Sequence, residues 1–158
     1  MDCATRKCIE DILASRSDMT LATLRSDGYP QANIVSYASD GLALYFGTGR
    51  DSQKVKNLRH SDKVSVTVNT PYANWNEIRG LSIAGTAQIL GDGSVDEWRA
   101  AELLLGKFPV DVQQVSSPPD QVAIVFVKIL PELISVVDYR KGFGHTELVT
   151  VEPVRATV

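Results

Sequence analysis

The chain has 158 residues, 44% of them hydrophobic and 22% charged, which is typical of a single globular domain with a substantial core. Its net charge of −3 argues against broad electrostatic binding to nucleic acid, because such binding needs a basic face. The sequence contains neither a run of about 18 apolar residues, which a membrane span needs, nor a signal peptide, so we expect a cytoplasmic protein.

The N-terminal third predicts one helix followed by hairpins. Ile9, Ile12 and Leu13 recur at helical spacing, which predicts a helix over residues 3–15. Two turn signals, SDGYP and SDG, then separate β-prone segments. They predict antiparallel strands at about 20–25, 31–37 and 43–47.

The middle of the chain predicts a short helix between strands. The segment DSQKVKNLRH has the pattern of a helix that begins at Asp51 or Ser52 and turns Val55 and Leu58 inward. KVSVTVN predicts a fourth strand, in which alternate valines share one face. IRGLSIAGTAQIL predicts a long fifth strand, where Gly80 and Gly85 indicate a bulge or a close backbone approach.

The C-terminal third begins with the strongest helix signal of the chain. SVDEWRAAELLLGKF has Ser94 as its cap, acids in its first turn and Gly106 at its stop. After a loop rich in Pro and Ser, QVAIVFVKIL and ELISVVDY predict two strands broken at Pro131, which cannot donate to a ladder and so marks a bulge or an edge. From Arg140 onward the pattern favours no single structure.

Mostly sequential strands joined by short hairpins favour an antiparallel barrel, because parallel strands would need a crossover helix between each pair. We therefore expect a mainly β (α+β) fold in one domain, residues 1–158. It is a six- to seven-stranded antiparallel split β-barrel with an N-terminal helix, a short helix and one longer helix.

The segment GTGRDSQKVKNLRHSDK combines a glycine-punctuated turn, a Ser at a helix start and a cluster of bases. Backbone N–H groups at a helix start favour an anion, and Ser52, Gln53 and Lys54 add a hydroxyl, an amide and a positive charge. These groups could together hold a phosphate. The same side chains could instead cap the helix or face solvent, and the residues alone leave both readings open.

The order and spacing of TLATLRSDGYPQANIVSY, LYFGT, SQKVKNL and VSVTV resemble the pyridoxamine 5'-phosphate oxidase-like, FMN-binding split barrels, from Met19 to Leu90. This resemblance implies an FMN whose phosphate lies between the third strand and the short helix. It also implies a homodimer with both cofactor sites at its interface. The residues implied to bind the phosphate are Thr48, Ser52, Gln53 and Lys54, and the backbone groups implied to meet the flavin ring are those of Asn33, Val35 and Ser36.

The sequence departs from the oxidases themselves. They place an Arg near Ala32, a Lys near Tyr37 and a Gln near Gly80, and their C-terminal segment carries substrate-binding Arg and His. None of these is present, so we expect an FMN-binding oxidoreductase of unknown substrate that is not a pyridoxamine phosphate oxidase. The alternatives are a deazaflavin-dependent reductase of the same superfamily and a non-enzymatic protein that binds flavin or haem.

We find no other catalytic or metal-binding pattern. Cys3 and Cys8 have no second Cys pair or nearby His, so we interpret them as reduced helix side chains. The sequence lacks a Walker loop, HExxH and a nucleophile elbow, so any chemistry would be the cofactor's. Trp75 and Phe143 stand in polar loops, where a flavin ring, a partner subunit or packing across the barrel mouth would each explain them.

Overall fold

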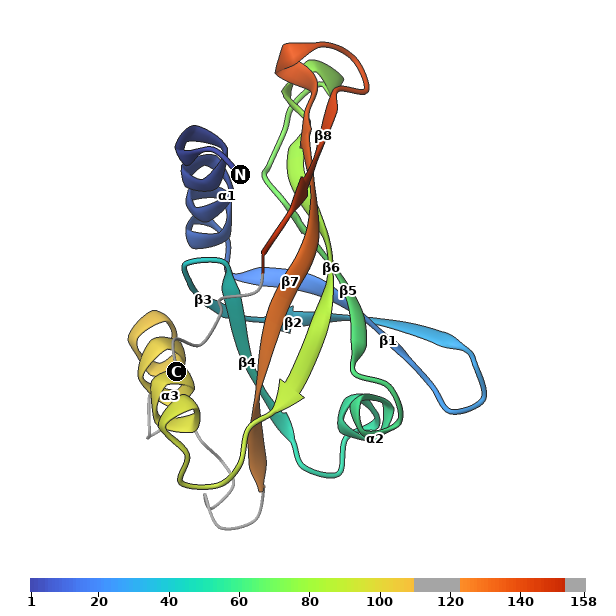
Figure 1. Cartoon of the computed structure of the whole chain (residues 1–158), viewed down its shortest axis with the longest axis vertical. Helices are drawn as coiled ribbons and strands as arrows, with labels where there is room; N and C mark the ends of the chain where they lie inside the picture. The colour runs from blue at the N-terminus through green and yellow to red at the C-terminus, as the bar shows by residue number, and fades with distance from the viewer. Residues whose placement is uncertain (110–122, 153–158) are drawn as a thin grey trace.

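The computed structural model describes residues 1–109 and 123–152, and these residues form eight strands and three α-helices (Figure 1). The strands are β1 (Asp18–Leu24), β2 (Pro30–Ser36), β3 (Ala38–Asp40), β4 (Ala43–Gly49), β5 (Lys63–Asn69), β6 (Arg79–Ile89), β7 (Ile124–Asp138) and β8 (Thr146–Thr150). The helices are α1 (Cys3–Ser15), α2 (Gln53–His60) and α3 (Val95–Lys107), with the short 3-10 turns η1 (Trp75–Glu77) and η3 (Tyr139–Lys141).

All the strands belong to one antiparallel sheet with the order β2-β1-β5-β6-β7-β4-β3. The long strand β7 pairs with β4 through its first half and with β8 through its second half. Only Tyr37 separates β2 from β3 in the chain, yet these strands stand at opposite ends of the order. The sheet must therefore curl to bring its ends together, which gives the split barrel that the sequence predicted.

The core lies inside this curled sheet and beneath α1. Strand β5 buries Val64, Val66 and Val68 on one face, as its alternating pattern predicted. Tyr37 is fully buried, and its hydroxyl donates to the Leu13 carbonyl at the end of α1 at 2.7 Å. Burial raises the pKa of Tyr37 to about 12, so the phenol remains neutral. The hydrogen bond of Tyr37 thus links the end of α1 to the junction between β2 and β3.

The bulge expected at Pro131 is confirmed, but the two predicted strands are one, because β7 continues through the proline for 15 residues. Its register against β6 shifts there: Ala84 pairs with Leu133 and Gly85 with Pro131, which leaves Glu132 as an extra residue. A Cβ on Gly85 would collide with the Leu130 carbonyl oxygen. The strand therefore passes the proline by a bulge, where its missing N–H disrupts no regular ladder.

Other boundaries also differ from the prediction. Gly106 lies inside α3, which continues to Lys107 and has Phe108 as its C-cap, because this glycine keeps a negative φ. The short strand β3 and the C-terminal strand β8 bring the strand number above the six or seven expected. Most of the predicted loop rich in Pro and Ser lies outside the described residues. None of the helices in the described ranges combines the length and apolar character that crossing a bilayer requires.

Candidate functional site

The turn from β4 into α2 brings two of the predicted phosphate-binding hydroxyls together. Thr48 Oγ1 and Ser52 Oγ lie 3.2 Å apart. Ser52 is the N-cap of α2, where its Oγ accepts from the Val55 N–H at 3.3 Å, so Ser52 rather than Asp51 begins the helix. The Ser52 N–H donates to the Gly49 carbonyl at 3.0 Å, which closes the turn. The two hydroxyl groups therefore lie together at the N-terminus of α2.

The first turn of α2 adds unused donors. Gln53 and Lys54 are its first two residues, and their backbone N–H groups have no partner within the helix because the i−4 carbonyls are missing. The half-buried Lys54 side chain makes no ion pair or hydrogen bond with any described residue. Lys56, Arg59 and His60 are exposed, and the helical period turns them to the opposite side of α2. The arrangement offers hydroxyls, amide N–H groups and one ammonium, a donor set that suits a phosphate.

The predicted ring-contacting residues of strand β2 direct their backbone groups to different sides of the strand. Its register pairs Val35 with Met19 and Asn33 with Leu21 on β1. Bonds from Tyr37 N–H to Ser17 O and from Arg25 N–H to Tyr29 O mark the odd-numbered residues of β2 as the hydrogen-bonded ones. Asn33 and Val35 therefore direct their backbone groups toward β1. Ser36 and the other even-numbered residues of β2 direct their backbone groups toward the free edge of the strand.

A buried asparagine in α2 connects these two regions, and our sequence reasoning missed it. Asn57 Nδ2 donates to Thr23 Oγ1 on β1 at 2.9 Å and to Gln31 Oε1 on β2 at 3.1 Å. Its Oδ1 accepts from Gln53 Nε2 at 2.8 Å. The one signal in the sequence was its place directly before the inward-facing Leu58. Helix α2 is thus tied to both strands of the first hairpin.

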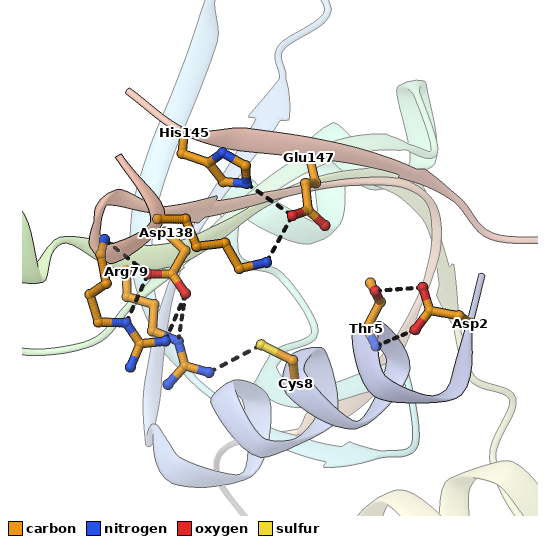
Figure 2. Close-up of polar contacts among 9 residues, drawn as sticks. Asp2, Thr5, Cys8, Arg79, Asp138, His145 and Glu147 are labelled. Atoms are coloured by element: carbon orange, nitrogen blue, oxygen red, sulfur yellow. Dashed lines mark hydrogen bonds and ion pairs between the residues drawn. The ribbon is translucent and has the colours of Figure 1, made fainter. Parts of the chain in front are cut away.

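The segment DYRKGFGHTE forms a separate ionic cluster beside α1 (Figure 2). Asp138 is buried, with 4% of its surface exposed, and accepts from Arg140 Nε at 2.8 Å and Nη2 at 2.7 Å. Arg79 reaches across from β6, where its Nη2 donates to Cys8 Sγ on α1 at 3.1 Å. Arg79 Nε is buried without a hydrogen-bond acceptor among the described residues, 4.0 Å from Asp138 Oδ2.

The outer part of this cluster is also paired. Glu147 Oε1 lies 2.8 Å from Lys141 Nζ and 2.9 Å from His145 Nε2. A cavity of about 260 Å³ separates these side chains from α1. Arg140 and Lys141 therefore have carboxylate partners, and the half-buried His145 ring lies within hydrogen-bond distance of Glu147. These pairs hold the turn from β7 to β8 together, and Arg79 links this turn to α1 through its hydrogen bond to Cys8.

Asp138 predicts a dependence of stability on pH. Its hydrogen bonds from the Arg140 side chain, first among several causes, lower its pKa from 3.8 to about 2. A carboxyl group whose pKa is lower in the folded than in the unfolded chain stabilises the fold at pH values above its unfolded pKa. The stabilisation by Asp138 is therefore complete above about pH 4 and is lost as the pH falls through about 2. We expect Asp138→Asn to reduce the free energy of unfolding at pH 7 by about 2 kcal/mol and to flatten its acid dependence.

Denaturant unfolding at a series of pH values measures this effect. Asp27→Asn is the control, because Asp27 also pairs with an arginine but lies fully on the surface. The two variants lose different amounts of unfolding free energy only if burial strengthens the Asp138–Arg140 pair. Equal losses in both variants would contradict the prediction.

The exposed aromatic side chains of the two polar loops contact each other. The Trp75 and Phe143 ring centroids lie 6.3 Å apart, and those of Tyr139 and Phe143 lie 5.3 Å apart. They belong to η1, η3 and the following turn, at the end of the molecule opposite to α2 (Figure 1). Within one chain, Trp75 and Phe143 therefore form their own cluster, away from the start of α2.

Comparisons with known proteins agree with this fold. Conserved hypothetical protein Rv2991 from Mycobacterium tuberculosis is 25% identical with a TM-score of 0.71, and the match covers 99% of this chain and 95% of that chain. A Listeria innocua protein provisionally named a pyridoxamine 5'-phosphate oxidase is 25% identical with a TM-score of 0.65, over 85% and 98% of the two chains. An F420 reductase is 27% identical with a TM-score of 0.61, over 80% and 94%.

The sequence comparisons give the family directly. No curated protein matches the chain. The family model described as pyridoxamine 5'-phosphate oxidase matches residues 5–136, which include every strand from β1 to β6 and most of β7. The chain therefore belongs to the pyridoxamine 5'-phosphate oxidase family.

Proposed function

We propose that this protein is a cytoplasmic, homodimeric FMN-dependent oxidoreductase whose substrate is not pyridoxamine phosphate. The observation that carries the proposal is the donor set at the start of α2. Thr48 and Ser52 supply hydroxyls, Gln53 and Lys54 supply free N–H groups, and Lys54 supplies an ammonium without a carboxylate partner among the described residues. Family membership and this donor set together favour a cofactor that carries a phosphate.

The chain's own part in such a site is to bind and orient. The α2 start would hold the phosphate, and β2 would offer the ring its half-buried Asn33 side chain and the backbone groups of Ser36 at the free edge. Val35 is buried and would support the strand from the core side. A flavin supplies the redox chemistry when bound, and N–H donors near its ring tune it.

Three observations support a substrate other than pyridoxamine phosphate. Tyr37, near which the oxidases carry a Lys, is a core residue bonded to Leu13. Gly80 has no room for a side chain, since a Cβ would lie 2.7 Å from the Val68 carbonyl oxygen. Arg140 and Lys141, the remaining basic pair, are engaged by Asp138 and Glu147. No second cluster of free bases among the described residues is placed to hold a substrate phosphate.

The outer face of the sheet supports the homodimer. Two cross-strand rows run over β2, β1, β5, β6, β7 and β8 without a charged residue, and none of their members is buried. One row is Ile34, Thr20, Thr67, Ser82, Ser135 and Leu148, and the other is Ala32, Ala22, Ser65, Ala84, Leu133 and Thr150. A solvated face normally carries charges, so these two uncharged rows suit contact with a second copy of the chain.

One alternative has its own support. The 27% identity to an F420 reductase favours a deazaflavin coenzyme in the same groove. Such a coenzyme would also place a phosphate group at the start of α2. The two cofactors differ in their ring, so the residues of the α2 start do not distinguish them.

The experiment is to purify the protein, record its visible spectrum and then titrate the cofactor-free protein with FMN, FAD and riboflavin. We expect a flavin spectrum and tightest binding of FMN, because riboflavin lacks the phosphate and FAD must fit a nucleotide beyond it. A deazaflavin spectrum would select the alternative, and a haem Soret band would refute both. FMN-loaded protein given pyridoxamine phosphate under air should form no peroxide above its background. Equal affinities for FMN and riboflavin would contradict the phosphate site.

A further inference from the structure

Helix α2 buries three side chains, Val55, Asn57 and Leu58, and only Asn57 is polar. It is 1% exposed. A buried amide is costly unless its hydrogen bonds are made, and removing its partners leaves that cost uncompensated. Asn57 makes three, so it is well satisfied where it lies. Its contribution is therefore directional, since hydrogen bonds fix geometry more tightly than apolar packing does.

The three partners of Asn57 lie on three different elements. Gln53 is one turn earlier on α2 itself, Thr23 is on β1 and Gln31 is on β2. Thr23 and Gln31 are also directly paired in the sheet. The amide of Asn57 thus fixes both the position of α2 along the first hairpin and its rotation about the helix axis. Val55 and Leu58 pack against the core but carry no such directional contact.

This geometry bears on the proposed cofactor site. Lys54 precedes Asn57 by three residues, so both lie on one side of α2, and Gln53 contacts Asn57 directly. The phosphate donors are therefore attached through Asn57 to β2, the strand proposed to face the ring. A ligand that contacts both the start of α2 and strand β2 has a fixed length. A displacement of about 1 Å between these two elements would therefore cost much of the ligand's affinity.

We propose that Asn57 is a positioning residue, which holds the phosphate-binding start of α2 and strand β2 at the separation that one FMN molecule spans. Asn57 itself does not touch the cofactor. This inference rests on the proposed function. It assigns to one buried amide the preference for the phosphorylated flavin over riboflavin, because only FMN needs both places at once.

The test compares FMN and riboflavin affinities in wild type, Asn57→Leu and Val55→Ala. Leucine keeps the branching and the number of heavy atoms of the Asn57 side chain, is somewhat larger, and removes its hydrogen bonds. Val55→Ala is the matched control, because it weakens the packing of the same helix and leaves the amide network intact. We expect Asn57→Leu to reduce the ratio of FMN to riboflavin affinity roughly tenfold or more, with riboflavin binding little changed. Val55→Ala should lower thermal stability and keep the ratio.

A second variant keeps the proposal testable if Asn57→Leu does not fold. Gln31→Leu removes only the β2 arm of the network at a half-buried position, and it should lower the same ratio. An unchanged ratio in Asn57→Leu, or an equal fall in Val55→Ala, would overturn the positioning role. If wild type itself shows no preference for FMN, the proposed function fails as well, and the wild-type titration alone reveals it.

Discussion

In the homodimer that we propose, Ile34→Lys is expected to give a monomer that releases FMN. Ile34 is 79% exposed and stands on β2 at the end of the first uncharged row. Its direct cross-strand neighbour Thr20, and Thr67 beyond it, are small and uncharged, so an introduced ammonium would have no carboxylate directly opposite it. A buried, unpaired charge at an interface between two copies would cost several kcal/mol. Cofactor loss follows if the sites form at that interface.

Size-exclusion chromatography with light scattering gives the mass, and visible absorbance of the same peak gives the bound flavin. Trp98→Lys is the control, because Trp98 is 71% exposed on α3 and lies outside the two rows. It should remain dimeric and keep its flavin. A dimeric Ile34→Lys would show that the copies meet elsewhere, and a monomer that still holds FMN would show that one chain completes the site.

Local signals predicted most of the elements correctly. Alternation placed β5, turn residues placed the first hairpins, and Ser52 and Ser94 proved to be the helix caps. These features depend on neighbours within a few residues, which a sequence displays directly. The glycines of β6 were also informative, since Gly80 and Gly85 both lie against backbone carbonyls.

The differences at Pro131 and Asn57 both involve partners that are distant in the sequence. Pro131 indicated a bulge or an edge, but only the pairing with β6 shows that β7 continues past the bulge as one strand. Asn57 resembles an ordinary polar residue on a helix, and its partners Thr23 and Gln31 are 34 and 26 positions away. No local pattern could have selected those partners. The elements that hold the candidate site together are therefore less visible in the sequence than the residues at its surface.

Lys54→Ala is expected to weaken FMN binding by about 1.5 to 3 kcal/mol, which is the range of a charge-assisted hydrogen bond. The half-buried Lys54 lies in the first turn of α2 and has no carboxylate partner among the described residues, so its ammonium is free to meet a phosphate. The control is Lys56→Ala, two residues later on the exposed side of the helix. This control removes the same charge from a position only two residues away.

Fluorescence titration of each variant with FMN and with riboflavin separates a contact from a general field. If Lys54 contacts the phosphate, its removal lowers the affinity for FMN, leaves that for riboflavin unchanged, and exceeds the effect of Lys56→Ala severalfold. If the bases of α2 act only as a positive surface, both lysines contribute alike, and both effects fade together as salt is added. Equal losses from the two variants would therefore remove Lys54 from the site, and the phosphate would then depend on the hydroxyls of Thr48 and Ser52 and the N–H groups of the helix start.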